Sequence, residues 1–517
     1  MKKAALAWML ICACLLSGCV PLTVNLQRDD QPVSLPAPTA RNYEPAVGDS
    51  LAGSIEGVYL YHLSSDQSQL IPSRSTLIVE SGQSALEEAM RALLEQPSSS
   101  EVRSVFPQGT QLEGITVSGN VAAVNLSIDA RNVESEQQLM WMRASIAQTL
   151  TQLDGIEYVQ MLIGGENESI SGLPMGAASA GETDMSSLWA RVSSEMELMN
   201  RQEAGGAQTA VTTRTAILYY PSRDGKYVVP TAQEVEISRG DCVTPVIQAL
   251  MNDPEDCPAL QAAVPKTKRS PLRKWEIVED ESGRRMLRLA FEANLIASLE
   301  REGLEAWQLY ASLTYTLTGF VPNVEGLIIL IGDGHLSRIE RSGQIVTFTG
   351  GEMNRTMYPD AVGRLAGIYL PCTDGGLTGL PRVLDQKGAV SPRSLLNELF
   401  RGPAEWEENA ARAFPDGVSI DDILGVRLLD NMAFVNLSSN MYRCCQSLTA
   451  QQERNLIYAI VNTLTSLKRI TAVQFQVEGE TVDTLVSEMF LRGPLIRNPG
   501  LIVKPEPEES AEPTETP

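Results

Sequence analysis

One order of strands, helices and turns occurs three times along this chain of 517 residues, at a spacing of roughly 150 to 160 residues. Each copy opens on a short run of β-branched and aromatic residues, which favours a strand: Val58–Tyr61, Ile217–Tyr220 and Ile368–Leu370. An amphipathic helix follows and stops before Pro97, Pro254 or Pro403, because proline cannot continue a helix. Solenoid repeats are much shorter, so the pattern indicates a domain duplicated within the chain.

The first and third copies also share short motifs. A turn signature, Phe-Pro-x-Gly, occurs at 106–109 and 414–417, and the tetrapeptide Val-Asn-Leu-Ser occurs at 124–127 and 435–438. Each tetrapeptide lies in the second strand of a predicted hairpin, and a second helix and a closing strand follow. This order predicts an α+β fold of three tandem small domains, each a mixed β-sheet packed by two helices.

A lipoprotein signal sequence is predicted at the N-terminus. Lys2 and Lys3 precede a short apolar stretch, and Leu16-Ser17-Gly18-Cys19 has the small residues and the cysteine of a lipobox. The apolar stretch is shorter than the roughly 20 residues that span a bilayer, so we expect cleavage before Cys19 and acylation of its thiol. Two acyl chains suffice for stable anchoring. The prediction is a lipid anchor at Cys19 on the extracytoplasmic face of the cell membrane.

Taken together, the opening strand, the helix that ends before a proline, Phe-Pro-x-Gly and Val-Asn-Leu-Ser resemble the GerMN domain of the GerM-type sporulation and spore germination lipoproteins. The middle copy departs from the pattern, because Val264-Pro265 stands where Phe-Pro is expected and a basic run follows. The resemblance implies three tandem GerMN domains related to ring-building modules of sporulation complexes. It also implies a non-catalytic envelope protein of endospore-forming bacteria.

The predicted organisation divides the chain into eight segments. These are the signal peptide at 1–19, a tether at 20–53, GerMN-like domain 1 at 54–166, a linker with an amphipathic helix at 167–212, divergent GerMN-like domain 2 at 213–334, a second linker at 335–362, GerMN-like domain 3 at 363–485, and a C-terminal segment at 486–517 with a disordered Pro/Glu tail.

Charge limits the class of partner. The formal net charge is -23 and the pI is about 4.6, so a nucleic acid backbone would be repelled and no nucleic acid partner is expected. The exception is a basic run in the middle copy, formed by Lys266, Lys268, Arg269, Arg273 and Lys274. This run is a candidate surface for an anionic wall polymer, for lipid headgroups or for an acidic protein, and a hydrated loop is the alternative. Peptidoglycan is a further candidate partner of the chain.

Eight cysteines occur, and five remain after Cys12, Cys14 and the acylated Cys19 are set aside. An extracytoplasmic location permits disulfides. The sequence-local candidates are Cys242 with Cys257, and Cys372 with Cys444 or Cys445. Because a predicted helix separates Cys242 from Cys257, and because the count is odd, free thiols are the alternative.

Reactive residues do not form recognisable sites. His62 and His335 have no neighbouring metal ligands in the sequence, so both are predicted to be surface histidines. Glu405, Glu407 and Glu408 around Trp406 fit a solvated loop better than a glycosidase cleft, which needs two opposed carboxylates. No catalytic, metal-binding or cofactor-binding residue is assigned, and no cofactor is expected.

An apolar stripe at helical spacing lies between the first two copies, formed by Met185, Leu188, Trp189, Val192, Met196 and Met199. We expect it to pack on its own domain, and docking of an adaptable partner is the alternative.

The preferred function is a membrane-anchored, non-catalytic scaffold that contacts envelope or sporulation-complex proteins in sporulation or spore germination. Exposed sheet edges or helix faces would provide the contacts. A solute- or wall-ligand-binding lipoprotein would instead need a deep polar pocket between domains, and an envelope hydrolase would need paired carboxylates in a cleft. Both alternatives rank lower because the copies share core and turn residues but no reactive ones.

Overall fold

A computed structural model describes residues 53–503 of the chain, with gaps at 80–83, 98, 154, 182–183, 204–210, 239, 255–256, 268, 280–282, 333, 336, 342, 374, 386–389, 430 and 487–488. The predicted signal peptide, the anchor residue Cys19, nearly all of the tether, Lys268 and the acidic tail lie outside the described residues. Within the described residues, no helix is long and apolar enough to cross a membrane.

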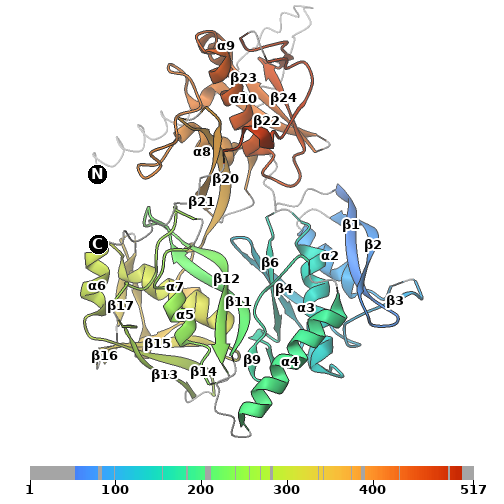
Figure 1. Ribbon diagram of the computed structural model, residues 1–517, viewed down its shortest axis with the longest axis vertical. Helices are drawn as coiled ribbons and strands as arrows, with labels where there is room; N and C mark the ends of the chain where they lie inside the picture. Colours follow the sequence, from blue (N-terminus) through green and yellow to red (C-terminus); the bar gives the residue numbers. More distant parts are fainter. Residues whose placement is uncertain are drawn as a thin grey trace, which may run out of the picture. The chain divides into compact units, whose positions relative to one another are not determined.

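The described chain contains three structural repeats that share one order of elements, to which the second and third repeats add a short helix (Figure 1). The first repeat is formed by β1 (Gly53–Ser64), β2 (Leu70–Val79), α2 (Ala85–Leu94), β4 (Leu112–Ser118), β5 (Val121–Leu126), α3 (Glu136–Leu150) and β6 (Tyr158–Ile163). The second is formed by β11 (Val211–Pro221), β12 (Val228–Ser238), α5 (Thr244–Ala249), β13 (Leu272–Glu279), β14 (Arg285–Phe291), α6 (Leu295–Arg301), α7 (Ala306–Phe320) and β15 (Gly326–Ile331). The third is formed by β20 (Gly363–Pro371), β21 (Leu377–Asp385), α8 (Pro392–Arg401), β22 (Ile423–Leu429), β23 (Met432–Leu437), α9 (Ser439–Cys445), α10 (Ala450–Leu464) and β24 (Ala472–Val477).

Two short strands complete the mixed sheet of each repeat by pairing antiparallel with its closing strand. They are β7 (Glu166–Asn167) and β10 (Ala178–Ser179) on β6, β16 (Gly334–His335) and β19 (Glu352–Met353) on β15, and β25 (Glu480–Thr481) and β26 (Leu495–Ile496) on β24. Segments predicted as linkers therefore contribute strands: β10 comes from 167–212 and β19 from 335–362. The remaining short strands are β3 (Val102–Arg103), β8 (Ser169–Ile170), β9 (Leu173–Pro174), β17 (Arg338–Arg341) and β18 (Gln344–Thr347).

Strand register repeats as faithfully as strand order. The parallel pairs begin at Val121↔Tyr158, Met286↔Gly326 and Met432↔Ala472, and each runs for six residue pairs. Each antiparallel hairpin before them has an irregularity at the same point, next to Gly114, Lys274 or Gly425. The predicted α+β fold of small mixed sheets with helices is confirmed.

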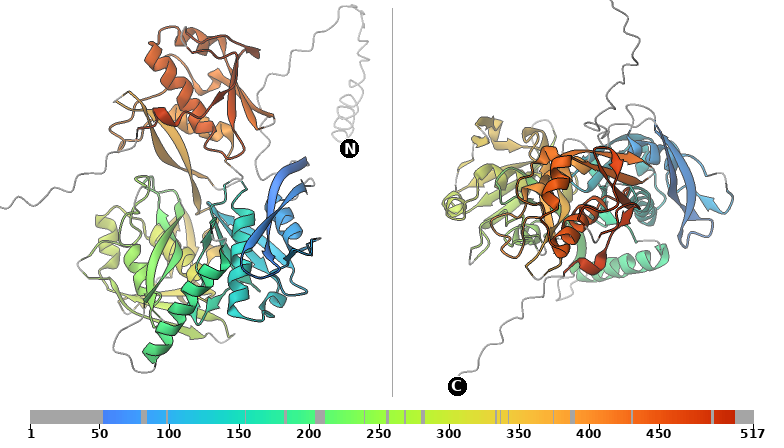
Figure 2. Two further views of the ribbon diagram at one scale, coloured as in Figure 1. Left: turned by 45° about the vertical axis from the view of Figure 1, so that its right-hand side comes forward. Right: turned by 90° about the horizontal axis from the view of Figure 1, so that it is seen from above.

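The opening strand of each repeat differs from the sequence expectation. It is 12, 11 or 9 residues long in β1, β11 and β20, and it forms a long hairpin that is separate from the mixed sheet. The long helix before the closing strand, which is α3, α7 or α10, contacts both this hairpin and the closing strand of the mixed sheet (Figures 1 and 2). Apolar side chains on both sides of the helix therefore become buried, as in α3, where twelve consecutive residues from Leu139 to Leu150 are buried.

A threonine on that helix holds the hairpin in all three repeats. Its hydroxyl accepts a hydrogen bond from the backbone N–H of a tyrosine in the opening strand, at 3.2 Å for Thr149, 2.9 Å for Thr316 and 3.0 Å for Thr463. The strand N–H groups at these positions are thereby satisfied without a third strand. The aromatic residues of the opening strands thus mark the place where hairpin and helix join.

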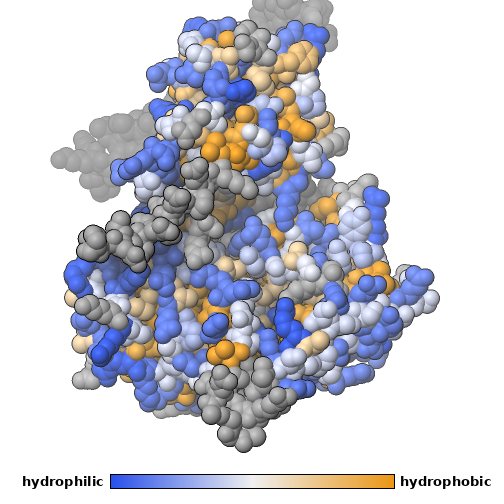
Figure 3. Space-filling model, viewed as in Figure 1, coloured by the Kyte–Doolittle hydropathy of each residue, from blue (hydrophilic) through white to orange (hydrophobic). Residues whose placement is uncertain are grey.

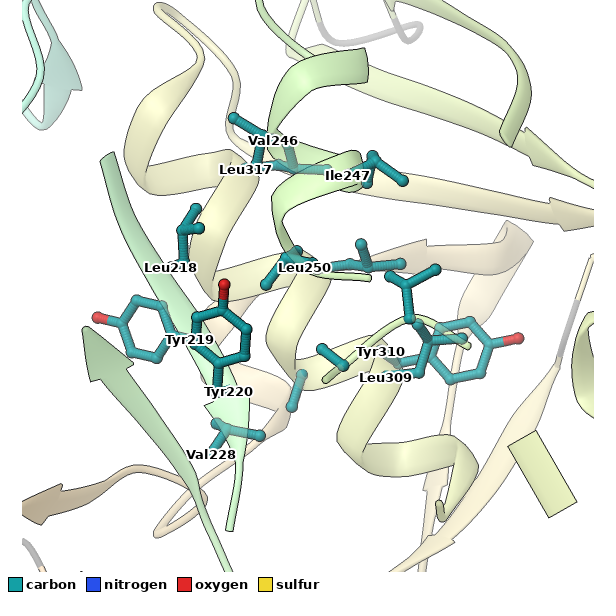
Figure 4. Close-up of a cluster of buried hydrophobic side chains, with 14 of the residues drawn as sticks. Leu218, Tyr219, Tyr220, Val228, Val246, Ile247, Leu250, Leu309, Tyr310 and Leu317 are labelled. Carbon is teal, nitrogen blue, oxygen red and sulfur yellow. The ribbon is translucent and has the colours of Figure 1, made fainter. Parts of the chain in front are cut away.

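Each repeat closes its own apolar core around this helix. In the second repeat, side chains from β11, α5 and α7 meet in one cluster that includes Tyr220, Leu250 and Leu317, all fully buried (Figure 4). The divergent turn of this repeat fits the same plan, because Val264 is fully buried where Phe106 and Phe414 are buried in the other two. A smaller apolar residue is enough there to fill the core position.

Candidate interaction surfaces

The repeated tetrapeptide Val-Asn-Leu-Ser stabilises the turn that follows the closing strand of the mixed sheet. Asn125 and Asn436 each accept a hydrogen bond through the side-chain oxygen, from the backbone N–H of Gly165 and of Gly479 respectively, both at 2.7 Å. These glycines follow the closing strand in left-handed turns, with φ of 84° and 86°. The motif therefore fixes the turn after the closing strand, and its polar side chains are used for structure rather than chemistry.

Glutamates around Trp406, considered in the sequence as a loop or a cleft, divide into two kinds. Glu405 and Glu408 are exposed, whereas Glu407 is buried and accepts hydrogen bonds from both terminal nitrogens of Arg382, at 2.5 and 2.6 Å. The backbone N–H of Ala404 donates to the same carboxylate at 2.8 Å. The solvated-loop prediction is wrong for Glu407, because its carboxylate binds Arg382 of β21 in the folded protein. This partner lies 25 positions earlier in the chain, so the local sequence does not reveal it.

The two histidines also differ. His335 is exposed, as expected, but His62 is 4% exposed within β1, so the surface prediction is wrong for it. Burial lowers the pKa of the His62 imidazole, because the charged form loses hydration. No group of three or more metal-ligating side chains occurs among the described residues.

Acidification is expected to destabilise the fold through His62. Because the folded-state pKa is lowered, the unfolded chain binds more protons as the pH falls below about 6.5, and stability decreases by up to about 1.4 kcal/mol per pH unit until the folded pKa is reached. Urea unfolding at pH 7 and pH 5 should therefore show a smaller loss for His62→Gln than for the unchanged chain. His335→Gln is the control, and an equal pH response in all three proteins would contradict the assignment.

All five cysteines outside the predicted signal sequence are free thiols in the structure, so Cys242, Cys257, Cys372, Cys444 and Cys445 give no support for a bridge. Burial raises the pKa of Cys242 and of Cys257 to about 11, and that of Cys445 to about 12. Such thiols are protonated at neutral pH and react slowly. The disulfide pairings stay predictions.

The basic run leads into β13, an edge strand of its sheet, and Arg273 and Lys274 lie in that strand. Lys266, Arg269 and Arg273 are exposed, but Lys274 donates to Glu276 at 2.6 Å. Glu276 also accepts from Arg288 at 3.1 Å, and hydrogen bonds from these two cations lower its pKa. Part of the positive charge is thus paired within the sheet, and the contact with an anionic polymer stays a prediction.

The apolar stripe between the first two repeats forms α4 (Met185–Glu203). Met185, Leu188 and Val192 are buried in the core of the first repeat, and Trp189 and Met196 pack against it. The expected packing on its own domain is confirmed for these five residues; the side chain of Met199 is outside the described part.

The mixed sheets provide the surfaces that distinguish the repeats. One face of each sheet packs on helices, and we call the opposite face the outer face. In the first repeat, the outer face carries Val121, which is 3% exposed and belongs to the core cluster of the second repeat. Gln160 and Asn167 on the same sheet donate to the carbonyl oxygens of Gly319 and Thr318, at the end of α7, the second at 2.7 Å. A neighbouring repeat therefore covers this outer face.

The other two outer faces have different chemistry. In the second repeat, the outer face carries paired charges. Glu276 and Arg288 are cross-strand partners that form an ion pair. Glu352, which lies in line with them across the strands, binds Arg284 at 2.9 Å. In the third repeat it carries Leu429 and Ile496, which are 51% and 69% exposed. Charge pairs suit a solvated face, whereas large exposed apolar side chains on one sheet suit a contact surface. The sequence pattern did not single out this face.

Comparison with known families gives two matches. Residues 59–169 and 368–483 match the family model Germane, described as sporulation and spore germination, and the second repeat lies outside both segments. No curated protein matches the chain.

Similar solved structures share low sequence identity with this chain. The tandem GerMN domains of the sporulation protein GerM from Bacillus subtilis match 56% of this chain and 98% of their own length, with 15% identity and a TM-score of 0.24. The first GerMN domain of that protein matches 25% of the chain and 96% of its own length, with 19% identity and a TM-score of 0.19. A putative lipoprotein from Clostridium perfringens matches 26% and 87%, with 18% identity and a TM-score of 0.18. The family relationship rests on the two sequence matches.

Proposed function

Since this chain is a GerMN-type protein, with Germane segments at residues 59–169 and 368–483, we propose that it acts in sporulation or spore germination as a membrane-anchored, non-catalytic protein scaffold. The second repeat is then a third, divergent GerMN-type domain. Its strand order, its six-residue parallel register and its threonine contact to the opening strand match those of the two flanking repeats, which supports this assignment.

One observation supports the proposed scaffold role most directly: the outer face of the first repeat packs on another repeat of the same fold. A fold that binds a neighbour through its sheet face is suited to building assemblies from similar modules. The shared motif residues support a non-catalytic role, because Asn125 and Asn436 are engaged in structural turns. The partners we propose are envelope or sporulation-complex proteins.

Anchoring through Cys19 is the second part of the proposal, and it predicts an all-or-none change. Replacement of Cys19 by alanine removes the thiol that carries the acyl chains, so the protein should move from the membrane fraction to the soluble fraction. Ultracentrifugation of lysed cells and immunoblotting would measure this. Cys372→Ala is the control, because that thiol is buried in the third repeat. A Cys19→Ala protein that stays with the membrane would remove the anchor from the proposal.

A crosslinking pull-down of the lipidated protein tests the scaffold role. The protein is recovered from sporulating cells of its host, with vegetative cells that express it at the same level as the control. Recovery of a defined sporulation or germination assembly only from sporulating cells would support the proposal. Recovery of wall fragments or a small ligand from both, with no protein partner, would favour a ligand-binding lipoprotein instead.

A further inference from the structure

A pocket of about 190 Å³ lies where the second repeat meets the third. The turn between β11 and β12, with Ala259, forms one side, and β21, the end of α8 and the loop after α8 form the other. Val383 of β21 packs against the core of the second repeat, which holds the two sides together. Small-molecule sites are common at such junctions, and this pocket is below the roughly 300 Å³ of sites for drug-sized ligands. It therefore suits a single ring.

Trp406 gives the pocket an apolar wall. The residue lines the pocket and is 45% exposed. The corresponding loops of the other repeats, residues 97–105 and 254–263, contain no aromatic residue, so the fold does not require one here. Much of the surface of the second and third repeats is hydrophilic (Figure 3). A large exposed indole on such a surface presents a flat apolar face that a ligand can cover.

The loop that carries Trp406 is held in place by the buried ion pair of Arg382 and Glu407. The Glu407 carboxylate accepts a hydrogen bond from the backbone N–H of Ala404 at 2.8 Å, and Arg382 donates to the carbonyl oxygen of Gly402 at 3.1 Å. The position of the indole is thus fixed before a ligand arrives. Such a wall loses little conformational entropy on binding.

A buried carboxylate lies in the same pocket. Glu398, near the end of α8, is 8% exposed. Its Oε2 atom accepts a hydrogen bond from Arg401 at 2.8 Å, whereas Oε1 accepts none among the described residues. A buried acceptor of this kind favours a ligand that donates a hydrogen bond through a hydroxyl or an amide N–H. A second anion would be repelled at this point.

The exposed cations of the pocket are also paired with acids. Lys226 contacts Asp224 at 3.3 Å, and Arg401 contacts Glu398. The side chains of Lys226 and Arg401 are 66% and 72% exposed, so their N–H groups can also donate to oxygen atoms of a ligand. Because each of these charges has a carboxylate beside it, the pocket favours a neutral polar ligand over an anion.

We propose that this pocket binds a neutral sugar ring of a glycan. A pyranose ring has apolar C–H groups on its faces and hydroxyl groups around its edge, which matches an indole beside carboxylate acceptors and cationic donors. One face of the ring lies on Trp406, and a hydroxyl or acetamido N–H donates to Oε1 of Glu398. Lys226 and Arg401 donate to oxygen atoms at the edge of the ring.

Saturation-transfer NMR tests this site with two neutral glycans as probes, the trimer of N-acetylglucosamine and maltotriose. The protein is the full mature chain with Cys19 replaced by alanine so that it is soluble. We expect a dissociation constant of about 0.1 to 10 mM for at least one probe, because a single ring makes few contacts. Trp406→Ala should raise this constant at least tenfold, and Trp406→Phe, which keeps an aromatic face, should raise it less. Circular dichroism would verify that both variants fold.

Phe490→Ala is the matched control, because Phe490 is an aromatic residue of the third repeat that is 64% exposed and does not line the pocket. It should leave the dissociation constant unchanged. Lys226→Met should weaken binding severalfold, because Lys226 is the contribution of the second repeat, and Lys266→Met is its control. Absence of binding of both glycans up to about 30 mM, above the expected range, would overturn the proposal. So would equal effects of Trp406→Ala and Phe490→Ala.

Sugar binding goes beyond the scaffold role and is independent of it. Sugar binding is measured with the purified protein, whereas the scaffold role is measured by recovery of an assembly from sporulating cells. A Trp406→Ala protein should still recover that assembly, so that either proposal can fail alone.

Discussion

Replacing Glu407 by glutamine should lower the stability of the third repeat by about 3 to 5 kcal/mol, because a buried cation loses its counter-charge. The side chains of Arg382 and Glu407 are 10% and 3% exposed. Arg382 also donates to the carbonyl oxygen of Gly402 at 3.1 Å, so it is held in place and cannot turn to solvent at low cost. With only 10% of the Arg382 side chain exposed, little water can reach the guanidinium to replace the lost carboxylate.

Urea unfolding, with hydrogen exchange of peptides from β20 to β24, would measure this loss and locate it in the third repeat. Glu405→Gln and Glu408→Gln are matched controls, because these neighbouring glutamates are exposed and each should change stability by less than about 0.5 kcal/mol. The double variant Arg382→Met, Glu407→Leu should recover much of the loss, since it removes both buried charges. A loss below about 1 kcal/mol for Glu407→Gln would show that the pair is solvated.

Replacing Val121 by aspartate should destabilise the contact between the first and second repeats by a similar amount, about 3 kcal/mol or more, because an unpaired carboxylate would be buried. Val121 lies in the apolar cluster of the second repeat, and Asn167 on the same sheet donates a hydrogen bond to the carbonyl oxygen of Thr318. The expected result is earlier urea unfolding of both repeats and faster hydrogen exchange in β5 and at the end of α7.

Met432→Asp is the matched control for this prediction, because Met432 occupies the same register position in the third repeat and is only partly buried. It should leave the unfolding of the first two repeats unchanged. Equal effects of Val121→Asp and Met432→Asp on those repeats would show that the two outer faces are equally solvated in solution, and would remove the structural support for the scaffold role.

Local signals in the sequence predicted most of the elements. The first helices end before Pro97 and Pro403, the hairpin of the first repeat turns at 119–120, and Thr449 with Gln452 begins α10, because these features depend on residues a few positions apart. The three-fold repeat was visible for the same reason. Each copy contains the same local signals in the same order, and the family match at two of them follows from these shared residues.

Contacts between residues far apart in the chain could not be predicted from the sequence. Glu407 reads as one of three similar glutamates, and only its partner Arg382 makes it a buried ion pair. His62 reads as a polar residue after a strand, yet the packing of β1 buries it. Segments that read as linkers supplied β10 and β19, because a two-residue strand carries no periodicity of its own.

The sequence by itself determined the repeat, the type and order of the elements, the predicted anchor at Cys19 and the side of each strand that is apolar. Only the tertiary structure decided what lies against each sheet face. Alternation along a strand places Val121, Met286 and Met432 on equivalent outer faces, but it carries no information on their neighbours. Val121 is covered by another repeat, Met286 is buried on a face that also carries charge pairs, and Met432 is only partly buried, because burial depends on contacts between parts of the chain far apart in sequence.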